Sequence, residues 1–167
     1  MRLLDGTTMV DDLDAFLGVL DDVAAATDTT VQAFDADYVV SETHLRRALD
    51  RADRAIARGE NVARERAVEV LCYAAGRRQI NRALEMGVSE GENRVVVLVD
   101  SPAGDDEAEA DAIEMLRDHI DEASVLGAYD EGTVREFFDI SEAALDAVDG
   151  GLADLVLERV ALLDVEK

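Results

Sequence analysis

The sequence predicts a mixed α/β, or α+β, fold: a small central β-sheet packed with several helices in a single compact domain over residues 1–167. Length is the first of three supporting observations, because a chain of 167 residues can bury a substantial core. Short apolar runs typical of strands are the second. The third is a set of longer segments whose apolar residues recur at helical spacing, with no long linker and no internal repeat.

The N-terminal third is expected to alternate strand and helix. A strand is predicted over residues 2–8 and an amphipathic helix over residues 11–26. A second strand is predicted over residues 31–40, and Ser41 then caps an arginine-rich helix. The apolar residues expected to face the core from the first helix are Leu13, Phe16, Leu17, Leu20 and Val23.

Glycines divide the middle of the chain into helices. Gly59 lies in the break that ends the arginine-rich helix, and residues 63–75 form the next helix. Gly76 and Gly87 bracket a short helical stretch. We expect these glycines to act as C-terminal stops, because glycine adopts the left-handed backbone conformation that commonly ends a helix.

The C-terminal half is predicted to contain one more strand followed by helices. Residues 94–99 form a nearly continuous apolar run, as expected for a buried strand, and a turn at residues 101–104 ends it. Four helices are then expected, over residues 105–126, 133–138, 141–148 and 152–165.

The composition is strongly acidic, with 39 Asp plus Glu against 16 Lys plus Arg and a formal net charge of −23. Self-repulsion on this scale strains a fold in dilute buffer, whereas molar salt shortens the Debye length to about 3 Å. The carboxylates are spread over nearly every expected helix rather than gathered in one tail. We therefore interpret the acidity as adaptation to a salt-rich cell interior.

Two features of the chain indicate a cytoplasmic protein. Uninterrupted apolar runs such as residues 95–99 are far shorter than the roughly 20 residues that span a bilayer. The N-terminal segment becomes acidic at Asp5, which is unlike a secretory signal.

Residues 43–88 depart from the acidic pattern, since they contain ten arginines and six acidic residues. At helical spacing, the residues expected to point inward are Leu45, Leu49, Ala52 and Ile56, and those on the opposite, solvent-facing side are Arg47, Arg51, Arg54 and Arg58. Further arginines follow at positions 64, 66, 77, 78 and 82. Two interpretations are open: a polyanion-binding face, or pairing with neighbouring acids such as Asp50, Asp53 and Glu65.

No catalytic constellation is evident. The sequence has no glycine-rich phosphate loop, no Gly-x-Ser-x-Gly element and no CxxC pair. His44 and His119 are the only histidines and Cys72 is the only cysteine, so we interpret them as packing or surface residues. The sequence therefore predicts no catalytic residue, no metal and no cofactor.

Residues 69–88 read EVLCYAAGRRQINRALEMGV. This segment resembles the core motif of the TPRKB-like small regulatory subunit of the KEOPS tRNA-modification complex. The matching positions are Glu69, Tyr73, Arg78, Gln79, Ile80, Ala83 and Gly87. Residues 37–40 also fit the family, and residues 152–166 resemble its last helix, so that the resemblance covers about half of the chain.

The resemblance implies a non-catalytic subunit of the complex that installs threonylcarbamoyl on a tRNA adenosine. Its implied partners are the kinase-like ATPase subunit and, for archaeal members, the single-stranded CCA end of tRNA. Arg78 and Gln79 are carried into the predicted RNA site by the motif, and Asn61, Arg64 and Arg77 are added because they lie close in sequence.

The last helix is predicted to supply the partner-binding surface, because its apolar residues cover more than one core face. Those expected to face the core are Leu152, Leu155, Val156 and Leu163. Leu157 lies off that stripe and is predicted to be exposed in the free protein and to contact the kinase-like subunit. The alternative is that residues 130–148 cover Leu157.

Two rival functions are left open. One is an independent enzyme whose pocket uses Glu69 with Arg78 on a small anionic substrate, and the other is a pure protein-interaction subunit without RNA contact. For Glu69 and Tyr73, the alternative to a direct functional role is a structural one, in which they orient the site or pack the helical hairpin.

Overall fold

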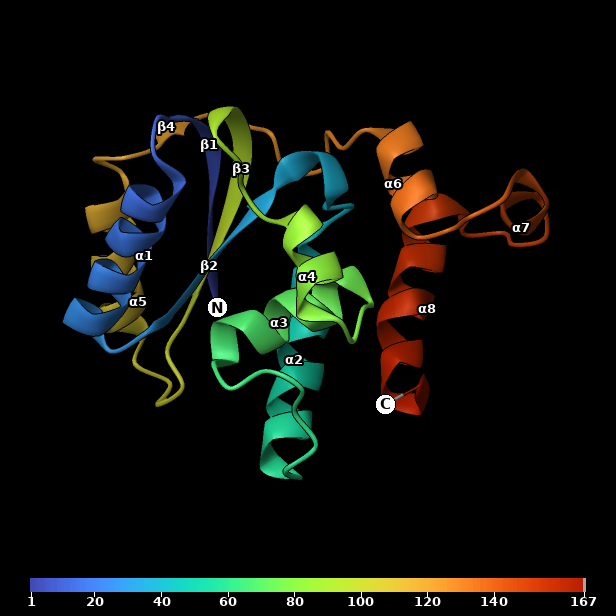
Figure 1. Ribbon diagram of the computed structural model, residues 1–167, viewed down its shortest axis with the longest axis horizontal. Helices are drawn as coiled ribbons and strands as arrows, with labels where there is room; N and C mark the ends of the chain where they lie inside the picture. The colour runs from blue at the N-terminus through green and yellow to red at the C-terminus, as the bar shows by residue number, and fades with distance from the viewer. Residues whose placement is uncertain (167) are drawn as a thin grey trace. The chain divides into compact units, whose positions relative to one another are not determined.

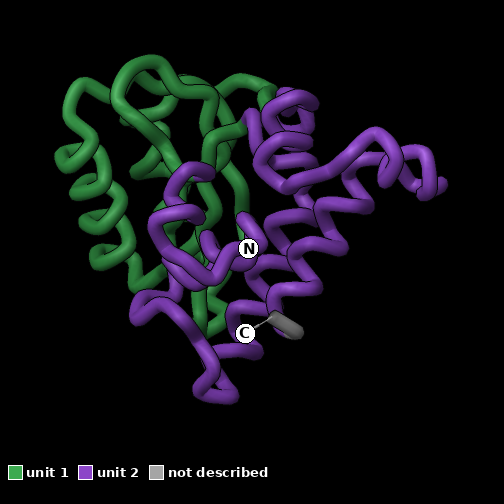
Figure 2. Tube along the Cα trace, turned by 45° about the vertical axis from the view of Figure 1, so that its right-hand side comes forward, with its two compact units in different colours: residues 1–36, 87–125 green, residues 37–86, 126–167 purple. Residues whose placement is uncertain are grey.

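The computed structural model describes residues 1–166, with side chains for residues 1–164, and it has the predicted α+β fold (Figure 1). The described residues form one four-stranded sheet and eight α-helices. The chain divides into two compact units (Figure 2). Unit 1 consists of residues 1–36 and 87–125, and unit 2 of residues 37–86 and 126–167. The single domain over residues 1–167 stays a prediction.

Unit 1 contains the sheet, in the strand order β2-β3-β1-β4 with every neighbouring pair antiparallel. Its strands are β1 (Arg2–Val10), β2 (Thr30–Asp35), β3 (Gly91–Asp100) and β4 (Asp121–Glu122). The three predicted strands are confirmed, and the residues of the apolar run 95–99 are all fully buried in β3. A one-turn 3-10 helix, Ala36–Tyr38, follows β2 where the sequence predicted that the strand would continue.

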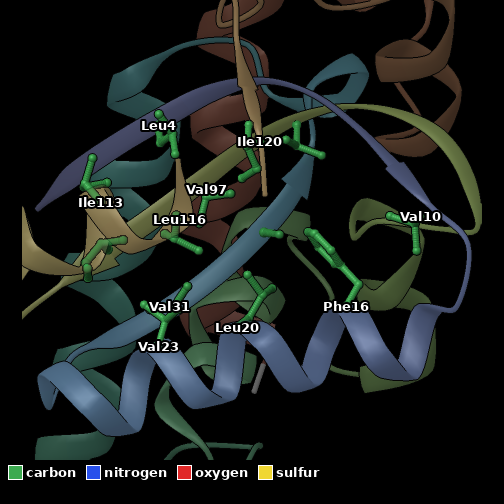
Figure 3. Packing of buried hydrophobic residues seen from close by; sticks show 14 residues of the cluster. Leu4, Val10, Phe16, Leu20, Val23, Val31, Val97, Ile113, Leu116 and Ile120 are labelled. Carbon is green, nitrogen blue, oxygen red and sulfur yellow. The ribbon is translucent and has the colours of Figure 1, made fainter. Parts of the chain in front are cut away.

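Two helices of unit 1, α1 (Leu13–Thr27) and α5 (Asp106–Leu116), lie side by side (Figure 1). Figure 3 shows Phe16, Leu20 and Val23 projecting from α1 into the apolar cluster that also holds Leu116 and Val97. The prediction for Leu17 was wrong, because this side chain is 41 % exposed. Leu17 is one position, or 100°, beyond Phe16, and the buried face of α1 is narrower than the apolar stripe in the sequence.

The helix predicted over residues 105–126 ends at Leu116, and the chain then forms the short strand β4. Gly6 of β1 allows β4 to pair there, because a Cβ at this position would collide with the Asp121 carbonyl. The Asp5 carboxylate adds a further bond, accepting the Val125 N–H at 2.9 Å. The end of α5 at Leu116 therefore depends on contacts of the following segment with β1, and helical periodicity in the sequence cannot predict such contacts.

Unit 2 is helical, and α2 (Glu42–Ala57), α3 (Arg66–Ala75) and α8 (Gly151–Glu166) pack against one another (Figure 1). Ser41 caps α2 as predicted, since its Oγ accepts the His44 N–H at 3.2 Å. Ile56 was wrongly expected to point inward: it is exposed, and Ala55 takes the buried position. The remaining elements are α4 (Ile80–Ala83), the 3-10 helix Leu84–Met86, α6 (Glu131–Phe137) and α7 (Glu142–Asp146).

Glycine ends two of these segments as predicted. Gly76 terminates α3 with a φ of 61°, and Gly59 follows α2 with a φ of 71°. Gly87 is not among the glycines with positive φ. Among the described residues, no helix combines the length and the apolar character that crossing a membrane requires.

Candidate functional site

The carboxylate of Glu69 fixes the turn between α2 and α3. Glu69 is fully buried on α3, and its Oε1 accepts the backbone N–H groups of Val62 and Ala63, both at 3.0 Å. Charge-assisted bonds of this kind are short and strong, and they satisfy a buried carboxylate that would otherwise be costly. The helix predicted to start at residue 63 therefore starts at Arg66, because residues 61–65 are held in the turn.

Asn61 lies within that turn. Its Nδ2 donates a hydrogen bond to the Ala63 carbonyl at 2.8 Å, while the residue as a whole is exposed. The turn therefore orients the Asn61 side chain through a local bond, and Glu69 positions the turn itself.

Asp164 of α8 joins all three main helices of unit 2. Tyr73 of α3 donates its hydroxyl to Oδ1 of Asp164, and Arg51 of α2 contacts Oδ2 at 2.7 Å. Arg58 approaches the same carboxylate at 3.8 Å. Only about a fifth of the Arg51 and Asp164 side chains is exposed (23 % and 22 %), so this ion pair is less screened by solvent than a surface pair.

The electrostatics of this group are coupled. Burial raises the pKa of Tyr73, and the hydrogen bond to Asp164 raises it further. Burial also opposes ionisation of Asp164, but the Tyr73 hydroxyl and the Arg51 guanidinium outweigh it and lower the pKa of this carboxyl. Asp164 is therefore ionised and Tyr73 protonated around neutral pH.

An open hollow of about 540 Å³ lies beside this group. We call it the Arg78 hollow, and the residues that line it are Glu60, Asn61, Val62, Arg78 and Asp164. Two of the five predicted RNA-binding residues, Asn61 and Arg78, thus meet at one place, although α3 separates them in the sequence.

The other three predicted RNA-binding residues are placed differently. Arg64 and Gln79 are exposed but are not among the residues that line the Arg78 hollow. Arg77 packs on α6: it donates to the Phe137 carbonyl, its guanidinium lies 5.1 Å from the centre of the Phe137 ring, and Asp139 is 3.8 Å away. Its contacts show how the structure anchors Arg77, and its role toward RNA stays a prediction.

Some arginines of residues 43–88 pair with acidic residues, and others are compatible with a polyanion-binding face. Arg66 forms a two-pronged contact with Asp53, at 2.8 and 2.9 Å, which supports pairing. Arg51 is turned toward Asp164, so the expectation that it faces solvent was wrong. Three exposed arginines have side chains that make no hydrogen bond or ion pair with any described residue: Arg47, Arg54 and Arg64. These three are compatible with a polyanion-binding face.

His44 is a packing residue, whereas His119 is exposed. The His44 ring is fully buried, with Nδ1 accepting the Val40 N–H at 3.3 Å and Nε2 donating to the Ala74 carbonyl at 2.8 Å. Both bonds can form only in the neutral tautomer that carries its proton on Nε2. Burial lowers the pKa of His44 to about 4, against an opposing contribution from the Ala74 bond. His44 therefore links the segment before α2 to the end of α3.

Leu157 of α8 is partly buried rather than exposed, so the prediction that water surrounds it was wrong. Val156, Val160 and Leu163 are fully buried, Leu152 is nearly so, and Leu155 is partly buried. The core stripe of α8 is thus close to the predicted one, and the partner-binding role of Leu157 stays a prediction.

A known protein family matches most of the chain. The family model described as kinase binding protein CGI-121 matches residues 15–164, which is most of the chain. The chain therefore belongs to the CGI-121 family of kinase-binding proteins, and the resemblance to TPRKB-like subunits is confirmed. None of the curated proteins compared with the chain matches it.

Proposed function

We propose that this chain is a non-catalytic regulatory subunit of a KEOPS complex, which docks on the kinase-like ATPase subunit and holds the single-stranded CCA end of tRNA in the Arg78 hollow. One observation carries the RNA part of the proposal: Asn61 and Arg78 line the same hollow in a chain of the CGI-121 family. The kinase-binding character of the family supports the docking part.

The chemistry of the hollow suits an unpaired RNA end. Arginine supplies a planar fork that matches a phosphate or a base edge, and asparagine supplies an amide that can bond to an exposed base. The volume of about 540 Å³ falls in the range usual for sites that hold small ligands. In a salt-rich cell the diffuse counterion contribution is weak, so short-range contacts of this kind would carry the affinity.

The hydrogen bonds that already occupy the carboxylates of Glu69 and Asp164 support a non-catalytic role. Glu69 is fully buried and bonded to two backbone N–H groups, and Asp164 is bonded to Tyr73 and Arg51. A general base must reach the proton that it removes, and a buried, doubly bonded Glu69 is poorly placed for that. The rival enzyme that pairs Glu69 with Arg78 therefore has little support.

A protein-interaction subunit without RNA contact is the second candidate. It is favoured by two exposed apolar side chains one helical turn apart, Ile80 (38 % exposed) and Leu84 (56 % exposed). In this candidate function a partner protein covers Ile80 and Leu84. The arginines nearby then serve only as ion-pair partners, as Arg82 does with Glu85 at 3.8 Å.

Gel mobility shifts with tRNA and with tRNA lacking CCA separate these functions. The proposal predicts that the wild-type chain binds intact tRNA more tightly, and that Arg78→Ala removes this preference at a cost of about 1–3 kcal/mol. Arg117→Ala is the matched control, because Arg117 is exposed, carries the same charge, lies outside residues 43–88 and does not line the hollow. Equal binding of the two tRNAs by the wild type would contradict the proposal.

A further inference from the structure

The carboxylate of Asp164 lies where the Arg78 hollow meets a second set of arginines. Asp164 lines the hollow together with Arg78, and it also binds Arg51 at 2.7 Å and approaches Arg58 at 3.8 Å. The carboxylate that borders the hollow of Arg78 is therefore also the one that Arg51 and Arg58 face. Guanidinium forks bind carboxylates and phosphates with similar geometry.

We propose that Asp164 is an internal anion that occupies the phosphate-binding position of the hollow and thereby limits the affinity of the free protein for RNA. The inference rests on the proposed RNA-binding function and adds a residue that governs its strength. A backbone phosphate entering the hollow meets the negative charge of Asp164 and competes with it for Arg51 and Arg58.

The surroundings of Asp164 favour this role over that of an ordinary surface ion pair. Its side chain is 22 % exposed, so that the carboxylate reaches the hollow while remaining close to its partners. The Tyr73 hydroxyl holds Oδ1, which fixes the direction of the carboxylate without neutralising it. Glu60, the other acid of the hollow, is 59 % exposed and pairs with Arg58 at 3.3 Å, so it is more screened by water.

Asp164→Asn is the informative substitution, because asparagine has nearly the same shape and its oxygen can still accept the Tyr73 hydroxyl bond. The charge is removed, and Arg51 and Arg58 become available to phosphate. Binding is measured by fluorescence anisotropy with labelled tRNA, in salt at which circular dichroism shows each variant to be folded. Asp164→Asn is expected to bind about two- to fivefold tighter than the wild type, the scale of one partly screened charge pair.

Two further variants separate charge from loosening of the fold. Glu158→Gln removes one negative charge from an exposed position of α8 and should leave the affinity unchanged. Tyr73→Phe removes the hydroxyl contact but keeps the Asp164 charge, so it should not tighten binding. The gain in Asp164→Asn should also shrink as salt rises, because screening weakens the repulsion that has been removed.

The outcomes distinguish this inference from the proposed function. If the wild type does not prefer tRNA with an intact CCA end, the proposed function fails. If that preference is present but Asp164→Asn binds no more tightly than Glu158→Gln, the Asp164 inference is overturned and the proposed function stands. Equal tightening by Tyr73→Phe, or loss of the fold in Asp164→Asn, would make Asp164 a structural residue and would likewise overturn the inference.

Discussion

The two units of this chain differ in what their buried polar bonds connect. In unit 1 the buried Glu109 of α5 accepts the Ser101 N–H that follows β3, whereas in unit 2 buried polar groups link helices. Unit 1 is built around a continuous apolar cluster between α1, α5 and the strands, with Leu116 and Val97 fully buried in it. Unit 2 joins its helices through buried polar groups as well, above all His44 and Glu69. A hydrogen bond depends on direction as well as distance, so it restricts how the groups that it joins can move. The candidate site lies in the unit whose helices are linked in this way.

The largest effect is expected in unit 1. Leu116→Ala should lower the free energy of unfolding by about 2–5 kcal/mol, because it removes a fully buried side chain and leaves a cavity. Leu17→Ala is the control on α1, and its exposed side chain should cost less than about 1 kcal/mol. Urea unfolding followed by circular dichroism measures both. Similar losses in the two variants would show that Leu17 belongs to the core.

The stability of unit 2 should depend on pH through His44. The folded state holds this ring neutral, with its pKa lowered to about 4, whereas the unfolded chain takes up a proton near 6.5. His44 therefore costs the folded state progressively more stability as the pH falls from about 6.5 to 4, by about 3 kcal/mol in total.

Comparison with His44→Gln isolates this effect, because the carboxylates of the chain are common to both proteins. The difference in unfolding free energy between wild type and His44→Gln should shift by that amount, to the disadvantage of the wild type, between pH 7 and pH 4. A difference independent of pH would show that His44 is accessible to protons in the folded state.

Removal of the Glu69 carboxylate should act mainly on the turn beside the hollow. Glu69→Ala leaves the N–H groups of Val62 and Ala63 without their acceptor, and we expect a loss of about 2 kcal/mol. Hydrogen exchange at these two amides should accelerate more than exchange in α1 of unit 1. Glu69→Gln retains an acceptor oxygen, so the two amides should exchange more slowly in it than in Glu69→Ala. Unchanged protection of both amides in Glu69→Ala would show that Glu69 does not hold the turn.

The smallest effect on stability is expected at Leu157, which is only partly buried. Leu157→Asp should leave the circular dichroism spectrum in high salt intact but reduce co-purification with the kinase-like subunit about tenfold or more. Binding of tRNA by the isolated protein should persist. If the variant unfolds instead, Leu157 is a core residue and the docking surface lies elsewhere.

The sequence predicted the elements of unit 1 better than the site in unit 2. The apolar run of residues 95–99 predicted β3, which is buried along most of its length. The end of α5 at Leu116 could not be predicted in this way, because it depends on the pairing of Gly6 with β4. The predictions for Leu17 and Ile56 were wrong for another reason. The apolar stripe of a helix in the sequence does not show how wide the buried face of that helix will be.

At the candidate site, the motif pointed to Arg78, and closeness in sequence added Asn61, which the structure places in the same hollow. The same closeness failed to separate Arg78 from Arg77, which turns to Phe137. Asp164 was missed altogether, although it is an acid among apolar residues of the last helix. Its role depends on partners 91 and 113 positions away in the chain, which no local pattern reports.

The most direct test of RNA binding in the Arg78 hollow is an NMR titration of ¹⁵N-labelled protein with a short single-stranded RNA that ends in CCA. The account predicts that the side-chain signals of Asn61 Nδ2 and Arg78 Nε shift as RNA is added, while the Arg117 Nε signal stays in place. Shifts that leave Asn61 and Arg78 unchanged, or no shifts in salt at which the protein is folded, would contradict it.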